Sequence, residues 1–465
     1  GNRVPASQAK GGYYVSDQSK INAAKKCVQH VVQAHSKLYE EMDYLSEAFI
    51  ELADERYSAR DAVGEIALAG KRIARIRDFR NVTVPSILMP MRSEEDIEYP
   101  SVAYFGSEAG FVGGINAPKL VECFGSDGNL YRILVKGNDD MRQDAVMENV
   151  FEIVSELLRS DAAAATRDLA IRTYRVVPLS PTAGILEWVE NTTTMSGYLV
   201  QGDGGGAHER YRPQDEGFRA LREKMAACPK RQSERLSTFL EICKVFKPVF
   251  RNFFLERFQN PSDWFHARTR YTRSMAVNSM VGYIVGLGDR HGGNILLDEK
   301  TAEVISIDLG MCFEFGKLLS TPETVPFRFT RDVIDGMGPF GKEGTFRRCS
   351  EIVMRVLRSN REVLEVVLEV FLHDPLFRWA LAPLKVIQEN HGFEVDEHGR
   401  GDLGEDVSLE GNLDATAALL RVREKLTGQE DQEVLDVEAQ VRRLMLQAGD
   451  PKNLCMMFEG WGAWV

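Results

Sequence analysis

The sequence predicts an α+β protein of two lobes, a small β-rich lobe and a larger helical one, with helical segments flanking them. Three observations lead to this class. Residues 20–78 place apolar side chains at helical spacing, residues 82–189 contain short apolar runs between turn residues, and helical spacing returns after Asn191. The 465 residues exceed what one hydrophobic core usually holds, so we expect several domains.

Each element is expected on local grounds. Breakers are rare over residues 20–78, which predicts two or three amphipathic helices there. Apolar runs at 119–124 and 130–135 flank Gly125-Ser-Asp-Gly128, which is typical of a hairpin. Residues 389–414 are rich in acids and glycine, so we expect them to be mobile. The other expected elements are strands at 172–178 and 184–189, and helices at 141–158, 234–258, 271–285, 343–360, 361–372, 412–427 and 430–448.

Composition excludes several classes of protein. The net charge of −12 argues against a general nucleic-acid binder, and the basic stretch Lys71–Arg80 is interpreted as a solvated helix face. No apolar run approaches the length of a membrane span. The seven cysteines form no Cys-x-x-Cys pair, which predicts a reducing compartment without structural zinc. The chain opens at Gly1 without a signal region, so we expect a fragment.

The most informative motif is Gly288–Asp298, which is followed by Ile307-Asp-Leu-Gly310. It offers Asp289, His291 and Asn294, and the second stretch adds Asp308. Transfer of a phosphoryl group from ATP needs a carboxylate that orients the acceptor hydroxyl, and an amide and a carboxylate that hold Mg²⁺. The common protein-kinase order is His-Arg-Asp, whereas this chain reads Asp-Arg-His. The alternative reading is a surface turn rich in glycine and aspartate.

These residue types predict distinct roles. Asp289 is expected to accept a hydrogen bond from the acceptor hydroxyl, and His291 to stabilise charge on the phosphoryl group. Asn294 and Asp308 are expected to ligate Mg²⁺ through oxygen, with Mn²⁺ as an alternative ion. Helix 271–285 is expected to hold this loop rigidly.

The β-rich section supplies the expected nucleotide contacts. Lys136 ends a strand and can reach ATP phosphates, with Asp144 as the first choice of carboxylate partner and Asp139 as the second. A lysine at a strand end is otherwise simply solvated. Gly113 and Gly114 are expected to cover the phosphates with backbone N–H groups, although two glycines in a hairpin are ordinary turn chemistry.

The adenine is expected at the crossover between the lobes. There the Val189 N–H and the Glu187 carbonyl would bind the base, and Trp188 would offer an aromatic face to it. A buried tryptophan in the core is the alternative. The apolar contacts expected to complete the pocket are Leu134 and Leu186.

Residues 308–338 are the candidate activation loop. Its cations, Lys317, Arg328 and Arg331, are dispersed, whereas a lipid kinase would need a basic cluster for inositol phosphates. An apolar, proline-bounded loop suits a peptide better. The residues expected to face the substrate are Thr321, Pro322, Glu323, Val325, Pro326 and Phe327.

These motifs resemble those of the phosphatidylinositol-3-kinase-related protein kinases, in particular the ataxia-telangiectasia-mutated (ATM) branch with its fungal telomere-maintenance orthologue. The resemblance rests on Lys136–Ala145, Gly286–His291 and Thr321–Arg328, and on the end of the chain, Asp450–Leu454 and Gly460–Val465. It implies a bilobal protein-kinase-like fold. The implied domains are the last FAT helices at 1–80, kinase lobes at 81–188 and 189–385, a regulatory segment at 386–432 and a FATC domain at 433–465.

The resemblance also implies an activity. It predicts a serine/threonine protein kinase that uses ATP and Mg²⁺ on Ser-Gln and Thr-Gln sites. It further implies a nuclear role at telomeres and in signalling of DNA double-strand breaks, recruitment by an Mre11-complex-type sensor, and a homodimer formed through the FAT and kinase region. No sequence-specific nucleic-acid binding by this part of the chain and no membrane association are expected.

Three alternatives stay open at this stage. A phosphoinositide lipid kinase shares the Asp-Arg-His motif, but the loop at 308–338 disfavours it. A catalytically inactive scaffold would need a blocked cleft, because Lys136, Asp289, Asn294 and Asp308 are all present. Gln388 is a candidate pseudosubstrate that occupies the pocket for the substrate glutamine, and an exposed helical glutamine is the plain alternative.

Overall fold

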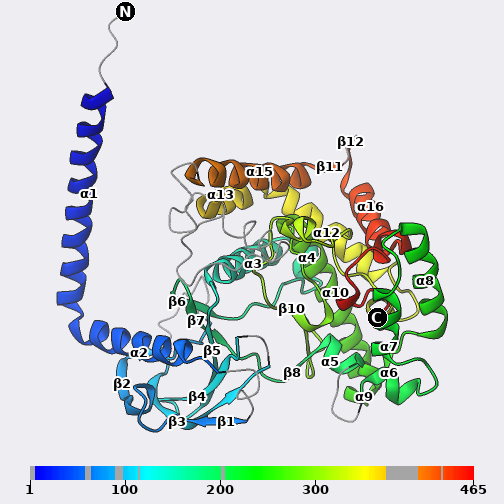
Figure 1. Cartoon of the computed structure of the whole chain (residues 1–465), viewed down its shortest axis with the longest axis horizontal. Coiled ribbons are helices and arrows are strands. Elements are labelled where there is room, and N and C mark those ends of the chain that lie inside the picture. The colour runs from blue at the N-terminus through cyan, green and yellow to red at the C-terminus, as the bar shows by residue number, and fades with distance from the viewer. Residues whose placement is uncertain are drawn as a thin grey trace, which may run out of the picture. The chain divides into compact units, whose positions relative to one another are not determined.

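A computed structural model describes residues 6–57, 64–88, 98–113, 116–200, 205–372, 407–430 and 433–465. The chain divides into two compact units, the first formed by residues 1–141 and 175–188 and the second by residues 142–174 and 189–465. Unit 1 is built on an antiparallel sheet and unit 2 is mainly helical (Figure 1). The predicted α+β class is therefore confirmed.

Unit 1 contains a seven-stranded sheet with the order β1-β3-β4-β5-β7-β6, and β2 pairs with β3 beside this path. All neighbouring strands are antiparallel. Burial alternates strictly along β4, so one face of the sheet points into the core of the unit. The strands are β1 (Glu65–Ala67), β2 (Arg77–Thr83), β3 (Ser101–Phe111), β4 (Lys119–Gly125), β5 (Leu130–Gly137), β6 (Val176–Ser180) and β7 (Ala183–Glu187).

Two helices precede this sheet, α1 (Ala6–Ala34) and α2 (Ser36–Asp54), and the 3₁₀ turn η1 (Ile73–Arg75) lies before β2. Helix α2 packs against β2, β5 and β7. Its apolar face is buried, and the Phe49 ring meets the Phe105 ring edge-on at 5.6 Å between centroids. The helix is thus held by the same core that holds the sheet.

Unit 2 is built around helix α10 (Pro261–Val285), which packs along α12 and is buried over its last four turns (Figure 1). Asn260 caps its first turn through Ser262 N–H, and Pro261 fits that turn because no helical partner is needed there. The other helices of unit 2 are α3 (Arg142–Ser160), α4 (Ala162–Ala165), α5 (Met195–Val200), α6 (Ala207–Tyr211), α7 (Phe218–Ala226), α8 (Gln232–Val245), α9 (Arg251–Arg257), α11 (Arg331–Gly336), α12 (Thr345–Ser359), α13 (Arg361–Leu372), α15 (Val407–Thr427), α16 (Val437–Gly449) and α17 (Pro451–Leu454).

Short strands frame the loop that carries the Asp-Arg-His triplet. A three-stranded sheet has the order β10-β9-β8, and a second, two-stranded sheet pairs β11 with β12. The first sheet was not predicted, because its strands are only three or four residues long. The elements are β8 (Thr192–Thr194), β9 (Ile295–Asp298), β10 (Val304–Ser306), β11 (Gln429–Glu430), β12 (Glu433–Val434) and the 3₁₀ turns η2 (Gly292–Asn294), η3 (Phe315–Leu318) and η4 (Glu459–Trp461).

The helical prediction over residues 20–78 is wrong at its end. Helix α2 stops at Asp54, and residues 65–83 form β1, η1 and β2. Gly64 and Gly70 have positive φ angles of 83° and 87°, which breaks a helix, and β1 gains a partner in β3. The basic stretch Lys71–Arg80 is therefore not a helix face.

Two further expectations need correction. The predicted helix 234–258 is two helices, α8 and α9, because Pro248 lacks an N–H and lies between them. The Asp332 carboxylate accepts hydrogen bonds from the backbone N–H groups of Val249 and Phe250, at 2.7 and 3.1 Å, and so starts α9. Helix α15 begins at Val407, inside the segment expected to be mobile, while residues 389–406 lie outside the described residues.

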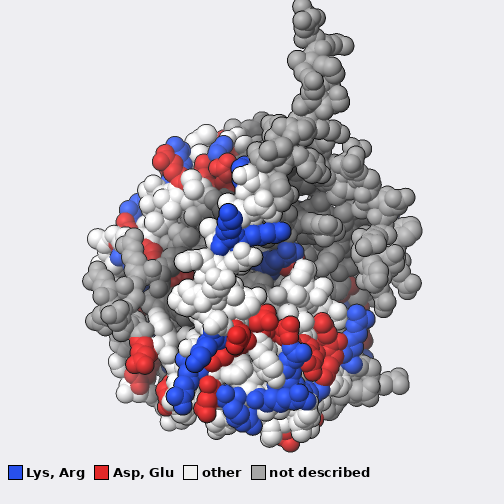
Figure 2. All heavy atoms as spheres, turned by 90° about the vertical axis from the view of Figure 1, so that its left-hand side faces the viewer, with Lys and Arg blue, Asp and Glu red and all other residues white. Residues whose placement is uncertain are grey.

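The hairpin at 119–135, the helix after Met141 and the helix at 361–372 are confirmed as β4–β5, α3 and α13. None of the described helices has an apolar stretch of membrane-spanning length. On the face shown in Figure 2, basic and acidic side chains lie interspersed among uncharged ones.

Trp464 is expected to carry much of the stability of unit 2. Its side chain is 1 % exposed and lies beside the Phe218 ring, at 5.7 Å between centroids. We expect Trp464→Ala to lower the free energy of unfolding by about 3–5 kcal/mol, because a large cavity is left behind. Leu446→Ala, at a side chain that is 59 % exposed, is the control and should change it by less than about 1 kcal/mol. Equal losses in a urea titration would contradict this.

Candidate active site

The end of α10 places the Asp-Arg-His triplet. Gly286 ends the helix with a φ of 63°, and a side chain there would meet the Glu314 N at 2.5 Å. The Gly288 N–H then donates to the Met311 carbonyl at 2.7 Å. Residues 286–294, which we name the catalytic loop, are thereby paired with the segment that follows Asp308.

Arg290 holds the two acidic segments together. It is buried, and its guanidinium donates to the carbonyls of Gly288, Asn294, Ile307 and Asp308. Its partners are backbone groups, so the Asp289 and Asp308 carboxylates are not consumed by an ion pair with it.

Asp289, His291 and Asn294 lie within reach of one another. His291 Nε2 is 3.9 Å from Asp289 Oδ2, and Asn294 Nδ2 donates to the same oxygen at 3.2 Å. The His291 Nδ1 accepts from the Gly293 N–H at 3.0 Å, so the neutral ring carries its proton on Nε2. A side chain at Gly293 would meet the His291 ring at 2.8 Å, which explains the glycine.

The surroundings shift the pKa values of Asp289 and His291 in opposite directions. Burial raises the pKa of the Asp289 carboxyl, and the Asp308 charge acts in the same direction, while His291 and Arg290 oppose it. Burial lowers the pKa of His291, which keeps the ring neutral at pH 7. Asp289 and Asp308 both have positive φ angles, 54° and 58°, a conformation that few residues adopt.

Helix α3 binds the Asp308 turn through its first residues. The Asp144 carboxylate accepts from the Leu309 N–H at 2.9 Å, and Gln143 Nε2 donates to the Gly310 carbonyl at 3.0 Å. The expected ion pair between Asp144 and Lys136 stays a prediction, since these residues belong to different units. Within unit 1, Lys136 Nζ lies 3.6 Å from the carboxylate of Asp139, the second choice.

Of the predicted adenine residues, Leu134 lies on β5, and Leu186 and Glu187 lie on the neighbouring strand β7. Leu134 faces Leu186 across β5 and β7, and the Trp188 N–H donates to the Arg132 carbonyl at 3.1 Å. The Glu187 carboxylate accepts from the Arg175 N–H at 3.0 Å. The Val189 residue opens unit 2. The predicted positions Gly114 and Gln388 lie outside the described residues, and Gly113 follows β3.

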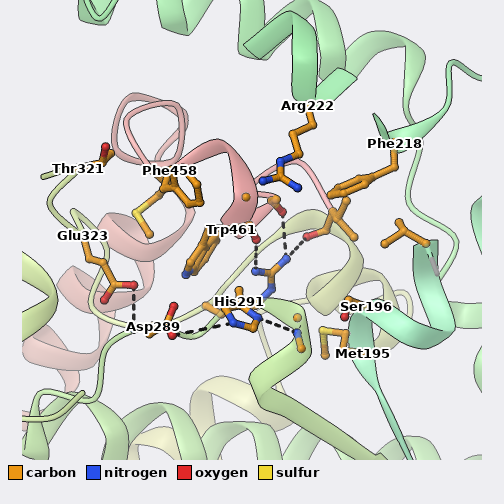
Figure 3. A pocket seen from close by; sticks show the side chains of 18 of the residues that line it. Met195, Ser196, Phe218, Arg222, Asp289, His291, Thr321, Glu323, Phe458 and Trp461 are labelled. Atoms are coloured by element: carbon orange, nitrogen blue, oxygen red, sulfur yellow. Dashed lines mark hydrogen bonds and ion pairs between the residues drawn. The ribbon is translucent and has the colours of Figure 1, made fainter. Parts of the chain in front are cut away.

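A cavity of about 530 Å³ opens beside the catalytic loop. Asp289 and His291 line it together with Thr321 and Glu323 of the candidate activation loop. Figure 3 shows that Phe218 and Arg222 reach it from α7, and Phe458 and Trp461 from the end of the chain. Pro322 neighbours these two loop residues in sequence, whereas Val325 and Pro326 line a separate cavity and Phe327 is buried in the core.

Some contacts of this site were not predicted from the sequence. Glu323 was expected to contact substrate, and its Oε1 accepts the Asp289 N–H at 2.9 Å. The cavity contacts of Phe218 and Arg222 had no sequence signal. The Trp-containing end of the chain carried a signal, since a tryptophan side chain has a large apolar area that is usually buried.

Comparison with known proteins decides the family. A profile of the family described as phosphatidylinositol 3- and 4-kinase matches residues 130–381, more than half of the 465 residues. The chain belongs to this family. A FATC-domain profile also matches residues 434–465.

Relatives and solved structures of this kinase family are similar over most of the chain. A serine/threonine-protein kinase ATM of Arabidopsis thaliana is 43% identical over 100% of the chain, and tel1 of Schizosaccharomyces pombe is 43% identical over 83%. The chain spans only 12% and 14% of those proteins. The structure titled "FAT and kinase domain of CtTel1" matches 92% of the chain and 29% of its own length, with a TM-score of 0.79 and 35% identity.

Glu323 is expected to make the stability of the kinase region depend on pH. Burial raises the pKa of this carboxyl from 4.5 to about 7, so between these values the folded chain holds a proton that the unfolded chain has lost. Its contribution to stability is therefore lost as pH rises from about 4.5 to about 7. Glu323→Gln keeps an acceptor for Asp289 and removes this dependence.

The measurement is the thermal unfolding midpoint as a function of pH. Wild type should lose stability relative to Glu323→Gln as pH rises through that window. Glu438→Gln, which changes an exposed carboxylate, serves as the control and should follow the wild type. Parallel pH curves for wild type and Glu323→Gln would contradict the assignment.

Proposed function

We propose that this chain is the catalytic region of a serine/threonine protein kinase that transfers the γ-phosphoryl group of ATP to a hydroxyl of a protein. The observation that carries this is the set of Asp289, His291 and Asn294 beside a cavity of about 530 Å³. The names of the relatives, serine/threonine-protein kinases ATM and tel1, support it.

The residues present supply the chemistry. Asp289 accepts a hydrogen bond from the acceptor hydroxyl and orients it, and the His291 Nε2–H donates to the charge that develops on the phosphoryl oxygens. Lys136 offers a point charge to the phosphates. Because the catalytic loop is fixed by Arg290 and Glu323, Asp289 and His291 are positioned before the substrate arrives.

Mg²⁺ fits the oxygen donors of Asn294 and Asp308. The side-chain nitrogen Nδ2 of Asn294 donates to Asp289, so the side-chain oxygen Oδ1 is the atom that would bind a cation. Residue Asp308 is exposed. Two protein oxygens suit Mg²⁺, which completes its shell with water and nucleotide phosphates. Among the described residues there is no group of three or more His, Cys, Asp and Glu side chains that would form a full protein cage. When bound, the ion neutralises charge on the phosphates.

The interactions of Lys317, Arg328 and Arg331, the three cations of the candidate activation loop, favour a protein acceptor over a lipid. Lys317 pairs with Glu314 at 3.0 Å. Arg328 is buried and donates to the Trp461, Gly462 and Val465 carbonyls, and Arg331 donates to the Trp464 carbonyl. All three are engaged within the protein, so they do not form a cluster for inositol phosphates.

The finer assignments rest on resemblance to the ATM branch. We propose Ser-Gln and Thr-Gln acceptor sites, a role in double-strand-break signalling and telomere maintenance, recruitment by an Mre11-complex-type sensor, and nuclear location. Homodimerisation is supported by similarity to the structure titled "Tel1 kinase butterfly symmetric dimer", at a TM-score of 0.78 and 34% identity. The domain boundaries after residues 80, 188, 385 and 432 are likewise proposed.

The test is transfer of labelled phosphate from ATP to three acceptors, a Ser-Gln peptide, the matching Ser-Ala peptide and phosphoinositide vesicles. We expect labelling of the Ser-Gln peptide. Asp289→Asn should lower the rate by about 10²–10⁴-fold with nucleotide binding retained, because orientation of the hydroxyl is lost. Asp263→Asn, at an exposed aspartate of α10, is the control and should keep the wild-type rate. Labelling of vesicles alone would overturn the proposal.

A further inference from the structure

Unit 1 buries a lysine that the proposed chemistry does not use. Lys119, the first residue of β4, is 2 % exposed. Taking an ammonium group out of water costs several kcal/mol unless it is fully hydrogen-bonded. Burial lowers the pKa of Lys119, although Glu55 opposes this. A buried cation therefore needs a specific reason to lie here.

Its partners are at the C-terminal end of helix α2. The Lys119 Nζ donates to the Glu55 carbonyl at 2.6 Å and reaches the Ala53 carbonyl at 3.5 Å. It also lies 5.3 Å from the centre of the Tyr57 ring. The last carbonyls of a helix lack helical partners and carry the negative end of its dipole, so they suit a cation. Lys119 is thus the cap of α2.

The same end of α2 packs closely against β5, the strand that carries Lys136. A side chain at Gly137 would meet the Ala53 carbonyl oxygen at 2.2 Å. Strand β5 therefore accepts α2 only because residue 137 is a glycine. In the register of β4 and β5, Lys119 faces Val135, one residue before Lys136. The Ala53 carbonyl is therefore contacted from two neighbouring strands, by Lys119 of β4 and by the backbone at Gly137 of β5.

We propose that Lys119 is a positioning residue, which locks the end of α2 onto β4 and β5 and thereby sets the height of Lys136 for the ATP phosphates. This inference rests on the proposed function. It makes nucleotide affinity depend on where α2 sits, since a shift of the helix end moves the glycine next to Lys136. Glu55 and Tyr57 reinforce the lock, because the Tyr57 hydroxyl and Lys71 both bind the Glu55 carboxylate.

The test measures KM for ATP, KM for peptide and kcat in the full-length protein. Lys119→Met keeps the apolar stem and removes the cation. We expect KM for ATP to rise about tenfold or more, since small displacements of a phosphate ligand are costly. We expect KM for the peptide to stay within about twofold. The control is Lys37→Met, at an exposed lysine of helix α2, with wild-type values expected.

A purely structural lysine gives another result. Lys119→Met would then unfold more easily, while the folded enzyme would keep the wild-type KM for ATP, and this outcome overturns the proposal. Should Lys119→Met not fold, Tyr57→Leu replaces it, with an expected rise of about threefold, and an unchanged KM overturns the proposal equally. If wild type itself neither binds ATP nor transfers phosphate, the proposed function has failed instead.

Discussion

The arrangement of the catalytic loop depends on one buried guanidinium group. Arg290 donates to carbonyls on both sides of the site, among them those of Asn294 and Ile307, and so fixes the spacing between the loop and the Asp308 turn. The backbone at Asp289 and at Asp308 is left-handed, which costs free energy and persists only when neighbours impose it. Because carbonyls rather than carboxylates satisfy the cation, the acids remain available for hydroxyl and metal.

The end of the chain is continuous with this network. Arg328 donates to the Arg290 carbonyl at 3.3 Å and to three carbonyls of the last five residues. Its guanidinium lies 4.3 Å from the centre of the Trp461 ring. Arg235 adds bonds to the Cys455 and Met457 carbonyls. The FATC residues are therefore part of the wall and the core of unit 2, and their removal would leave several arginines buried without acceptors.

Sequence reasoning succeeded where the signal was local. The β4–β5 hairpin was predicted from the turn residues Gly125 and Gly128, and the Asp-Arg-His triplet was recognised from its spacing to Asn294. It failed where a distant partner decided the structure. Residues 65–67, which were expected to be helical, form strand β1 because β3 pairs with them. Every residue has a backbone carbonyl, so the sequence does not show which carbonyls an arginine will bind. The structural roles of Arg290 and Arg328 could therefore not be predicted.

The most direct measurement compares Arg290→Lys with wild type in two quantities, the rate of phosphate transfer and the affinity of the protein for Mn²⁺ in the presence of ATP. Arg348→Lys, at an exposed arginine, is the control. A lysine keeps the charge and cannot span four carbonyls. The account predicts that transfer falls by about 100-fold or more and that Mn²⁺ affinity falls with it, because both acids lose their shared support. Wild-type transfer and wild-type Mn²⁺ affinity in a folded Arg290→Lys protein would contradict it.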